Sequence, residues 1–168
     1  MNKLAALALT GTVAACSSAE LEDFTADPLT VSAPSSPNWV LAAPKEADPT
    51  TPATLEAPVF ATGPAELLGY LDQIVATEAR VERLAPSGAD RAFVQRSANV
   101  GFPDVISVSA LDLGAGDAGA RSGLVIFSRS VYGYGDLGVN KARVRRWLAK
   151  LEETAPVVAG RGTTGDGS

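Results

Sequence analysis

The residues best suited to chemistry are arginines, aspartates and hydroxyl side chains that recur inside apolar surroundings between residues 95 and 143. Such residues can form a closed network, in which each arginine pairs with a carboxylate, or a pocket for an anion. Glycines towards the end of this segment would let backbone N–H groups approach a ligand. The candidate residues are Arg96, Ser97, Asp104, Ser128, Arg129, Ser130, Asp136, Asn140 and Arg143.

Two roles of this cluster follow from its charges, and a third is weaker. In a structural role, Asp104 and Asp136 pair with the arginines, and Asp136 or Asn140 caps the following helix. Three arginines against two aspartates leave one positive charge over, so the alternative is a site for a phosphate, a carboxylate or a lipid head group. Catalysis ranks third, because an Asp104–Asp136 acid–base pair requires the two carboxylates to lie close together.

Composition excludes several classes of site. The chain has no histidine, which removes the usual general base, the Ser-His-Asp arrangement and most zinc sites. The segment Tyr132-Gly133-Tyr134-Gly135 lacks the Gly-Lys-Ser/Thr ending of a phosphate loop. We therefore predict no metal and no cofactor. A net charge of −5 and the lack of a clustered basic face argue against a nucleic-acid partner.

The first sixteen residues predict export and a membrane anchor. Lys3 precedes a short apolar run over 4–15, which ends in Val13-Ala14-Ala15 before Cys16, the one cysteine of the chain. This pattern is typical of a bacterial lipoprotein signal peptide, cut before Cys16, whose thiol then carries lipid. The run is too short for a permanent spanning helix. Ser17 favours the outer membrane over the inner membrane, on the periplasmic side of the cell envelope.

The elements that must position the candidate residues form one small domain. We divide the chain into a signal peptide over 1–15, a flexible acidic tether over 16–33, a single domain over 34–154 and a disordered tail over 155–168. Short loops between the expected strands favour antiparallel pairing. The predicted fold class is α+β, with an antiparallel β-sheet of about four to five strands and two helices packed on one face.

Alternation and three- to four-residue spacing locate the elements. One helix opens at 62–66 and runs to about residue 77 or 78, and the other covers about 138–153. In the second helix, Val144, Trp147, Leu148 and Leu151 form an apolar stripe, and the arginines lie off it. Segment 34–44 should lie extended against the domain. Strands are expected at 59–62, 80–85, 91–97, 104–113 and 121–131.

Several short motifs carry a resemblance to a known family. The motifs are Phe93-Val94-Gln95-Arg96-Ser97, Phe102-Pro103-Asp104, Phe127-Ser128-Arg129-Ser130, Asp136-Leu137-Gly138-Val139-Asn140 and Arg143 through Trp147-Leu148. Over residues 34–153 the chain resembles the bacterial domain of unknown function 1499. The resemblance implies an exported lipoprotein or a protein with membrane segments, and it implies no reaction, substrate or cofactor.

The predicted function is a cell-envelope lipoprotein that binds and does not catalyse. Its first candidate ligand is a small anionic envelope component held by Arg96, Arg129 and Arg143. The alternative is a protein-interaction lipoprotein in envelope maintenance, in which the polar cluster only holds the fold. A hydrolase that uses carboxylates is the third hypothesis. The expected partners are the membrane, through lipid on Cys16, and a small anion or an envelope protein.

Overall fold

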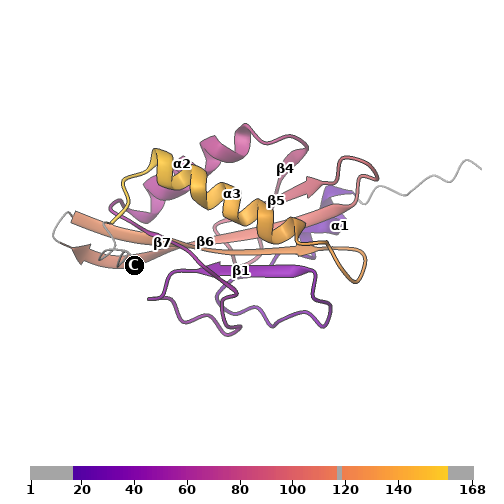
Figure 1. The fold of residues 1–168 in the computed structure, drawn as a ribbon, viewed down its shortest axis with the longest axis horizontal. Helices are drawn as coiled ribbons and strands as arrows, with labels where there is room; N and C mark the ends of the chain where they lie inside the picture. The colour runs from indigo at the N-terminus through magenta and orange to yellow at the C-terminus, as the bar shows by residue number, and fades with distance from the viewer. Residues whose placement is uncertain (1–16, 117–118, 159–168) are drawn as a thin grey trace, which may run out of the picture.

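The computed structural model describes residues 17–116 and 119–158. In these ranges, seven strands form one open sheet and three helices lie against it (Figure 1). The mixed α/β class is confirmed, but four to five strands were too few. The elements are α1 Ser18–Glu22, β1 Trp39–Ala43, β2 Leu55–Glu56, β3 Val59–Phe60, α2 Pro64–Ala76, β4 Val81–Leu84, β5 Arg91–Arg96, β6 Pro103–Gly116, β7 Gly119–Ser130 and α3 Val139–Thr154.

Strand β7 is the centre of the sheet, whose order is β2-β1-β7-β6-β5-β4, with β3 also paired to β7. The residues of β7 from Leu124 to Phe127 are almost fully buried, as a continuous apolar run predicts. Segment 34–44, expected to lie extended, supplies β1, in which Leu41 pairs with Phe127. All described pairs are antiparallel except β1 with β2, so the expected antiparallel character holds apart from this short pair.

Helices α2 and α3 cover one face of the sheet (Figure 1). Their apolar stripes meet alternate strand residues such as Phe93, Ile106 and Ile126 in the largest buried cluster. The indole of Trp147 in α3 stands edge-on to the Phe93 ring, with 5.9 Å between ring centroids. Edge-to-face geometry is favoured for aromatic pairs, so this contact helps to fix α3 over β5.

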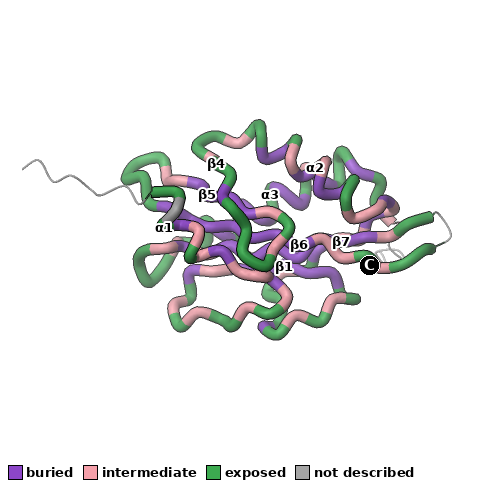
Figure 2. Tube along the Cα trace, turned by 180° about the vertical axis from the view of Figure 1, so that it is seen from behind, coloured by how far each residue is buried: buried purple, intermediate pink, exposed green. Residues whose placement is uncertain are grey.

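The opposite face is covered by the N-terminal segment, so the flexible tether predicted for 16–33 is wrong for residues 17–33. Leu21 in α1 is fully buried against Leu84, Val94 and Val105, and Phe24 packs at the edge of this cluster. The physical reason is that the strands are apolar on both faces. The two longer helices cover one face, and the other needs a second layer. In Figure 2 the strands are buried between outer layers whose loops are largely exposed.

The segment after α3 also belongs to the domain, which corrects the predicted start of the tail at residue 155. Ala155 is buried, and the backbone continues beside β3. The Ala61 N–H donates to the Pro156 carbonyl at 2.7 Å, and the Val158 N–H donates to the Val59 carbonyl at 2.9 Å. The predicted signal peptide over 1–15, the predicted lipidation site Cys16 and the rest of the predicted tail, 159–168, lie outside the described residues.

Helices α2 and α3 are also joined by charge. The Glu78 carboxylate, just beyond α2, accepts hydrogen bonds from Arg146 and Lys150, each at 2.8 Å. The hydrogen bond from Arg146 is the largest influence on Glu78. Together with the Lys150 hydrogen bond and both positive charges, it outweighs burial and lowers the pKa from 4.5 to about 2. The ion pairs of Glu78 with Arg146 and Lys150 therefore stabilise the fold as long as Glu78 is ionised.

The packing of α1 predicts that Leu21→Ala lowers the free energy of unfolding by about 2–5 kcal/mol, the usual cost of emptying a buried leucine site. Urea unfolding followed by circular dichroism measures this change. The exposed Val100→Ala serves as the control and should leave the midpoint unchanged. An unchanged midpoint for Leu21→Ala would mean that the N-terminal segment is detached from the sheet.

The lowered pKa of Glu78 predicts a pH-dependent loss of stability. Because the folded pKa lies below the unfolded one, the stabilisation is complete above pH 4.5 and disappears as the pH falls towards 2. Glu78→Gln should lower the free energy of unfolding by about 1–2 kcal/mol at pH 7, since both partner side chains are partly exposed and screened. Urea titrations at several pH values should show this difference shrinking in acid, whereas the control Glu82→Gln should show none.

Candidate functional site

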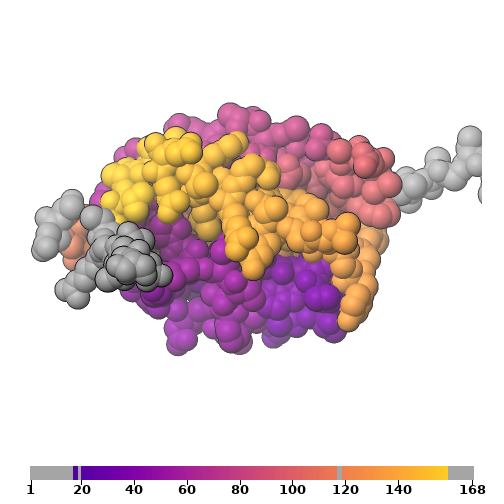
Figure 3. Space-filling model, viewed as in Figure 1, coloured from indigo at the N-terminus to yellow at the C-terminus, as the bar shows by residue number. Residues whose placement is uncertain are grey.

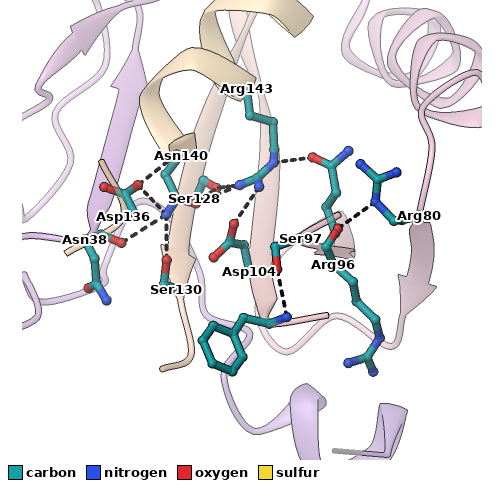
Figure 4. A network of polar contacts seen from close by, with 12 residues as sticks. Asn38, Arg80, Arg96, Ser97, Asp104, Ser128, Ser130, Asp136, Asn140 and Arg143 are labelled. Carbon is teal, nitrogen blue, oxygen red and sulfur yellow. Dashed lines mark hydrogen bonds and ion pairs between the residues drawn. The ribbon is translucent and has the colours of Figure 1, made fainter. Parts of the chain in front are cut away.

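Arg143 is the centre of the polar cluster. Its side chain is buried, with only 3% of the residue exposed. The guanidinium group donates to the Asp104 carboxylate at 2.6 Å, to the Asn140 amide oxygen at 2.7 Å and to the Ser128 hydroxyl at 3.1 Å. Its Nε–H donates to the side-chain oxygen of Gln95 (Figure 4). A buried cation is tolerated only with such compensation, so the charge of Arg143 is used within the fold.

The register of the sheet explains why these partners meet. Gln95 pairs with Asp104 across β5 and β6, and Asp104 pairs with Ser130 across β6 and β7, which sets three polar residues in one row. In α3, Asn140 and Arg143 occupy the first turn of the buried stripe that continues through Val144. The expectation that Arg143 lies off the stripe is therefore wrong. Because the strands present a row of polar side chains beneath α3, a charged residue on the buried side of the helix finds hydrogen-bond partners there.

Asn140 joins α3 to β7 and to the residue just before β1. It is fully buried, and its amide nitrogen lies 3.1 Å from the Asn38 carbonyl oxygen and 3.0 Å from the Ser130 hydroxyl. Its amide oxygen accepts a hydrogen bond from Ser128 at 2.6 Å. Asn38 precedes β1, and its own amide donates to the Gly133 carbonyl at 2.7 Å. One side chain thus fixes the start of β1, the end of β7 and the first turn of α3.

Asp136 holds the start of α3. Its carboxylate accepts hydrogen bonds from the backbone N–H of Gly138 at 3.0 Å and of Asn140 at 2.8 Å, as well as from the Asn140 side chain. Burial alone would raise the pKa of Asp136, but these hydrogen bonds outweigh it and lower the pKa below its usual value. The N-cap position of α3 is held by Gly138, so neither Asp136 nor Asn140 is the N-cap residue; Asp136, two residues earlier, accepts hydrogen bonds from the first turn and stays ionised as an acceptor rather than acting as an acid.

Three of the nine candidate residues do not join this network: Ser97, Arg129 and, as described below, Arg96. Ser97 closes the loop between β5 and β6 by accepting a hydrogen bond from the Phe102 N–H at 3.0 Å. Arg129 lies on the face opposite α3, with its guanidinium carbon 5.4 Å from the centre of the Phe24 ring. Burial lowers the pKa of Arg129, and its Nε is buried without a hydrogen-bond partner among the described residues.

The three arginines therefore do not converge, contrary to the prediction of one anion pocket. Ser128 and Ser130 point towards α3, and strand alternation places Arg129 between them on the other face. Arg96 follows Ala92 and Val94 on that other face as well. Figure 4 shows the guanidinium group of Arg96 directed away from Arg143.

The cluster offers no open reactive group. Asp104 is held by Arg143 and Asp136 by the start of α3, so neither carboxylate is placed as the partner of the other. No set of three acidic or cysteine side chains suited to a metal ion occurs in the described ranges. Open hollows of about 380 and 390 Å³ lie around β2, towards the other end of the sheet, where Lys45 pairs with Glu56 at 3.2 Å.

Two further residues complete the network beyond the nine candidates. Gln95 follows Phe93 on the α3 face of β5, and this alternation is the sequence feature that could have singled it out. Asn38 stands immediately before the apolar run of β1, a position that gives only weak information about its long-range partner. Both residues are polar side chains at strand ends, where a buried network can begin.

Fold and cluster together define a small mixed α/β domain whose buried polar residues tie the ends of its strands to a helix. The chain belongs to the DUF1499 family of proteins of unknown function, which matches residues 21–151. The match begins at Leu21, the residue that α1 buries, and ends at the buried Leu151 of α3. No curated protein and no solved structure is significantly similar to the chain. None of the helices in the described ranges is long and apolar enough to cross a bilayer.

The network predicts that Arg143→Met lowers the free energy of unfolding by about 3–5 kcal/mol, because it leaves the Asp104 carboxylate buried and uncompensated. Chemical denaturation measures the loss. Arg145→Met is the matched control, since Arg145 is exposed two positions along the same helix, and it should change stability little. Adding Asp104→Asn to Arg143→Met should recover part of the lost free energy of unfolding. Equal losses for Arg143→Met and Arg145→Met would contradict a structural role of Arg143.

Proposed function

We propose that the protein is an exported lipoprotein of the cell envelope, anchored through Cys16, whose domain is a non-catalytic interaction module. The observation that carries the proposal is the closed network around Arg143, which commits the best-placed polar groups to the fold. The anchor is supported by the apolar run over 4–15 and the Val13-Ala14-Ala15-Cys16 sequence. Ser17 favours placement at the outer membrane.

Among the three hypotheses from sequence, the interaction lipoprotein has the best support. A pocket for a small anion retains only Arg96 and Arg129, which lie on the face opposite Arg143. A hydrolase would need Asp104 and Asp136 to leave their present hydrogen bonds before either could move a proton. The interaction hypothesis needs neither change, because it uses the outer surface of the domain and leaves the cluster intact.

The structure also changes the expected geometry of the anchor. Because α1 begins at Ser18, only Ser17 separates the proposed lipid-bearing residue from the folded domain. Two residue steps of extended chain span about 7 Å at most. A lipid on Cys16 would therefore hold the domain directly against the bilayer rather than at the end of a stalk.

The anchor predicts a mature protein that begins at Cys16 and carries lipid on its thiol. Mass spectrometry of the protein isolated from its native membrane should show the loss of residues 1–15 and an added mass of lipid on the N-terminal peptide. Cys16→Ser should abolish this mass and release the protein from the lipidated fraction, whereas the control Ser17→Ala should retain the modification. An intact Met1 or a free thiol at Cys16 in the native product would refute the anchor.

A further inference from the structure

The large exposed apolar side chains of the domain gather on two loops. Apart from Val157, those of the described residues all belong to the β5–β6 loop or to the segment from the end of β7 to the start of α3. Leu137 is as exposed as in an extended chain, and Tyr134 is 77% exposed. We call this surface the loop-end patch; it consists of Val100, Phe102, Tyr132, Tyr134, Leu137 and Val139.

The two loops form one surface. The rings of Phe102 and Tyr132 lie 6.2 Å apart between centroids, and the Val131 N–H donates to the Pro103 carbonyl at 3.1 Å. Figure 3 shows the two segments, salmon and orange, adjoining at the right-hand end of the molecule. An apolar surface of this kind on a soluble domain marks an interaction site more often than scattered single residues do.

The loops hold these side chains outward by defined contacts. Ser97 closes the β5–β6 loop, and the Asn38 amide and the Asp136 carboxylate hold the segment before α3. Leu137 has a φ of 52°, in the left-handed region that costs energy for a residue with a side chain. Because the Leu137 side chain is fully exposed, it makes no packing contact that would offset this backbone strain. The residue therefore points to a use outside the fold.

The patch lies at the end of the molecule where α1 begins. Val131, the residue before Tyr132, packs with Leu21 of α1 in the same apolar cluster. Figures 1 and 2, from opposite sides, both place α1 at the end that carries the two loops. Since Ser18 begins α1, the proposed anchor and the patch are attached at the same end of the domain.

We propose that the loop-end patch inserts into the interface of the bilayer that holds the Cys16 lipid, so that the domain stands on the membrane by two contacts. This inference rests on the proposed anchor. Tyrosine and phenylalanine with leucine and valine suit the boundary between acyl chains and head groups. The anchor makes docking intramolecular, so even a weak apolar contact is populated.

Charge at this end favours apolar insertion over attraction to anionic lipid. The exposed or half-exposed basic residues here include Arg80, Arg96 and Lys141, but the adjoining α1 segment carries Glu20, Glu22 and Asp23. These opposite charges offset one another, whereas the large exposed side chains of the two loops are apolar. Docking should therefore depend little on the anionic lipid content or on salt.

The test uses the protein isolated from its native membrane with one added cysteine, Leu137→Cys, labelled with an environment-sensitive dye and reconstituted in phosphatidylethanolamine vesicles. We expect the dye at position 137 to emit several-fold more in vesicles than in buffer without lipid or detergent. Lipids that carry a nitroxide at the head-group boundary should quench this emission, and 1 M salt should leave it unchanged. The matched control is Ala115→Cys, which is exposed on the β6–β7 hairpin and should show none of these effects.

The outcomes separate the patch from the anchor. One dye per chain shows that Cys16 is blocked, whereas two dyes show a free Cys16 thiol and refute the anchor. A blocked Cys16 with an unquenched dye at position 137 refutes docking alone. Protection of position 137 in cells but not in vesicles also refutes it, because a protein partner would then cover the patch. Emission that responds equally at positions 137 and 115 shows non-specific adsorption and overturns the proposal.

Discussion

The need to neutralise one buried cation organises this fold. Arg143 places its guanidinium group beneath α3, where water cannot reach it, and every contact that compensates the charge comes from a different strand or from the helix itself. Such a contact is a poor source of net stability but a strict condition on geometry, since a shifted register leaves the charge without partners. The strand ends and α3 are therefore bound to one mutual arrangement.

The second constraint is the sheet, whose strands are apolar on both faces. Helices α2 and α3 cover one face, and the N-terminal segment with α1 covers the other, so the family match starts at the residue that this layer requires. The cluster around Arg143 and the layer around Leu21 lie on opposite sides of the same strands. Together they leave the loops at one end as the surface on which large apolar groups remain exposed.

Much of this architecture could be predicted from the sequence, because hydrophobic periodicity locates elements well. Both longer helices, the strands from Val81 onward and the family were predicted correctly. The features that the sequence did not predict depend on residues that are far apart in the chain. Leu21 and Phe24 stand in a polar, acidic stretch that resembles a linker, and only the open face of the sheet explains their burial. Likewise, alternation along β7 separates Arg129 from Ser128 and Ser130, which adjacent letters in a sequence do not reveal.

The pairing of β1 with β7 has a kinetic consequence. Trp39 pairs with Arg129 and Ala42 pairs with Ile126, so β1 and β7 join residues about 84 to 90 positions apart in the chain. Closing such long loops costs chain entropy before any contact compensates it, and proteins with many of them fold slowly. Before β7 is made, a nascent chain offers β1 only the short parallel pairing with β2, so β1 can take its full place in the sheet only late in synthesis.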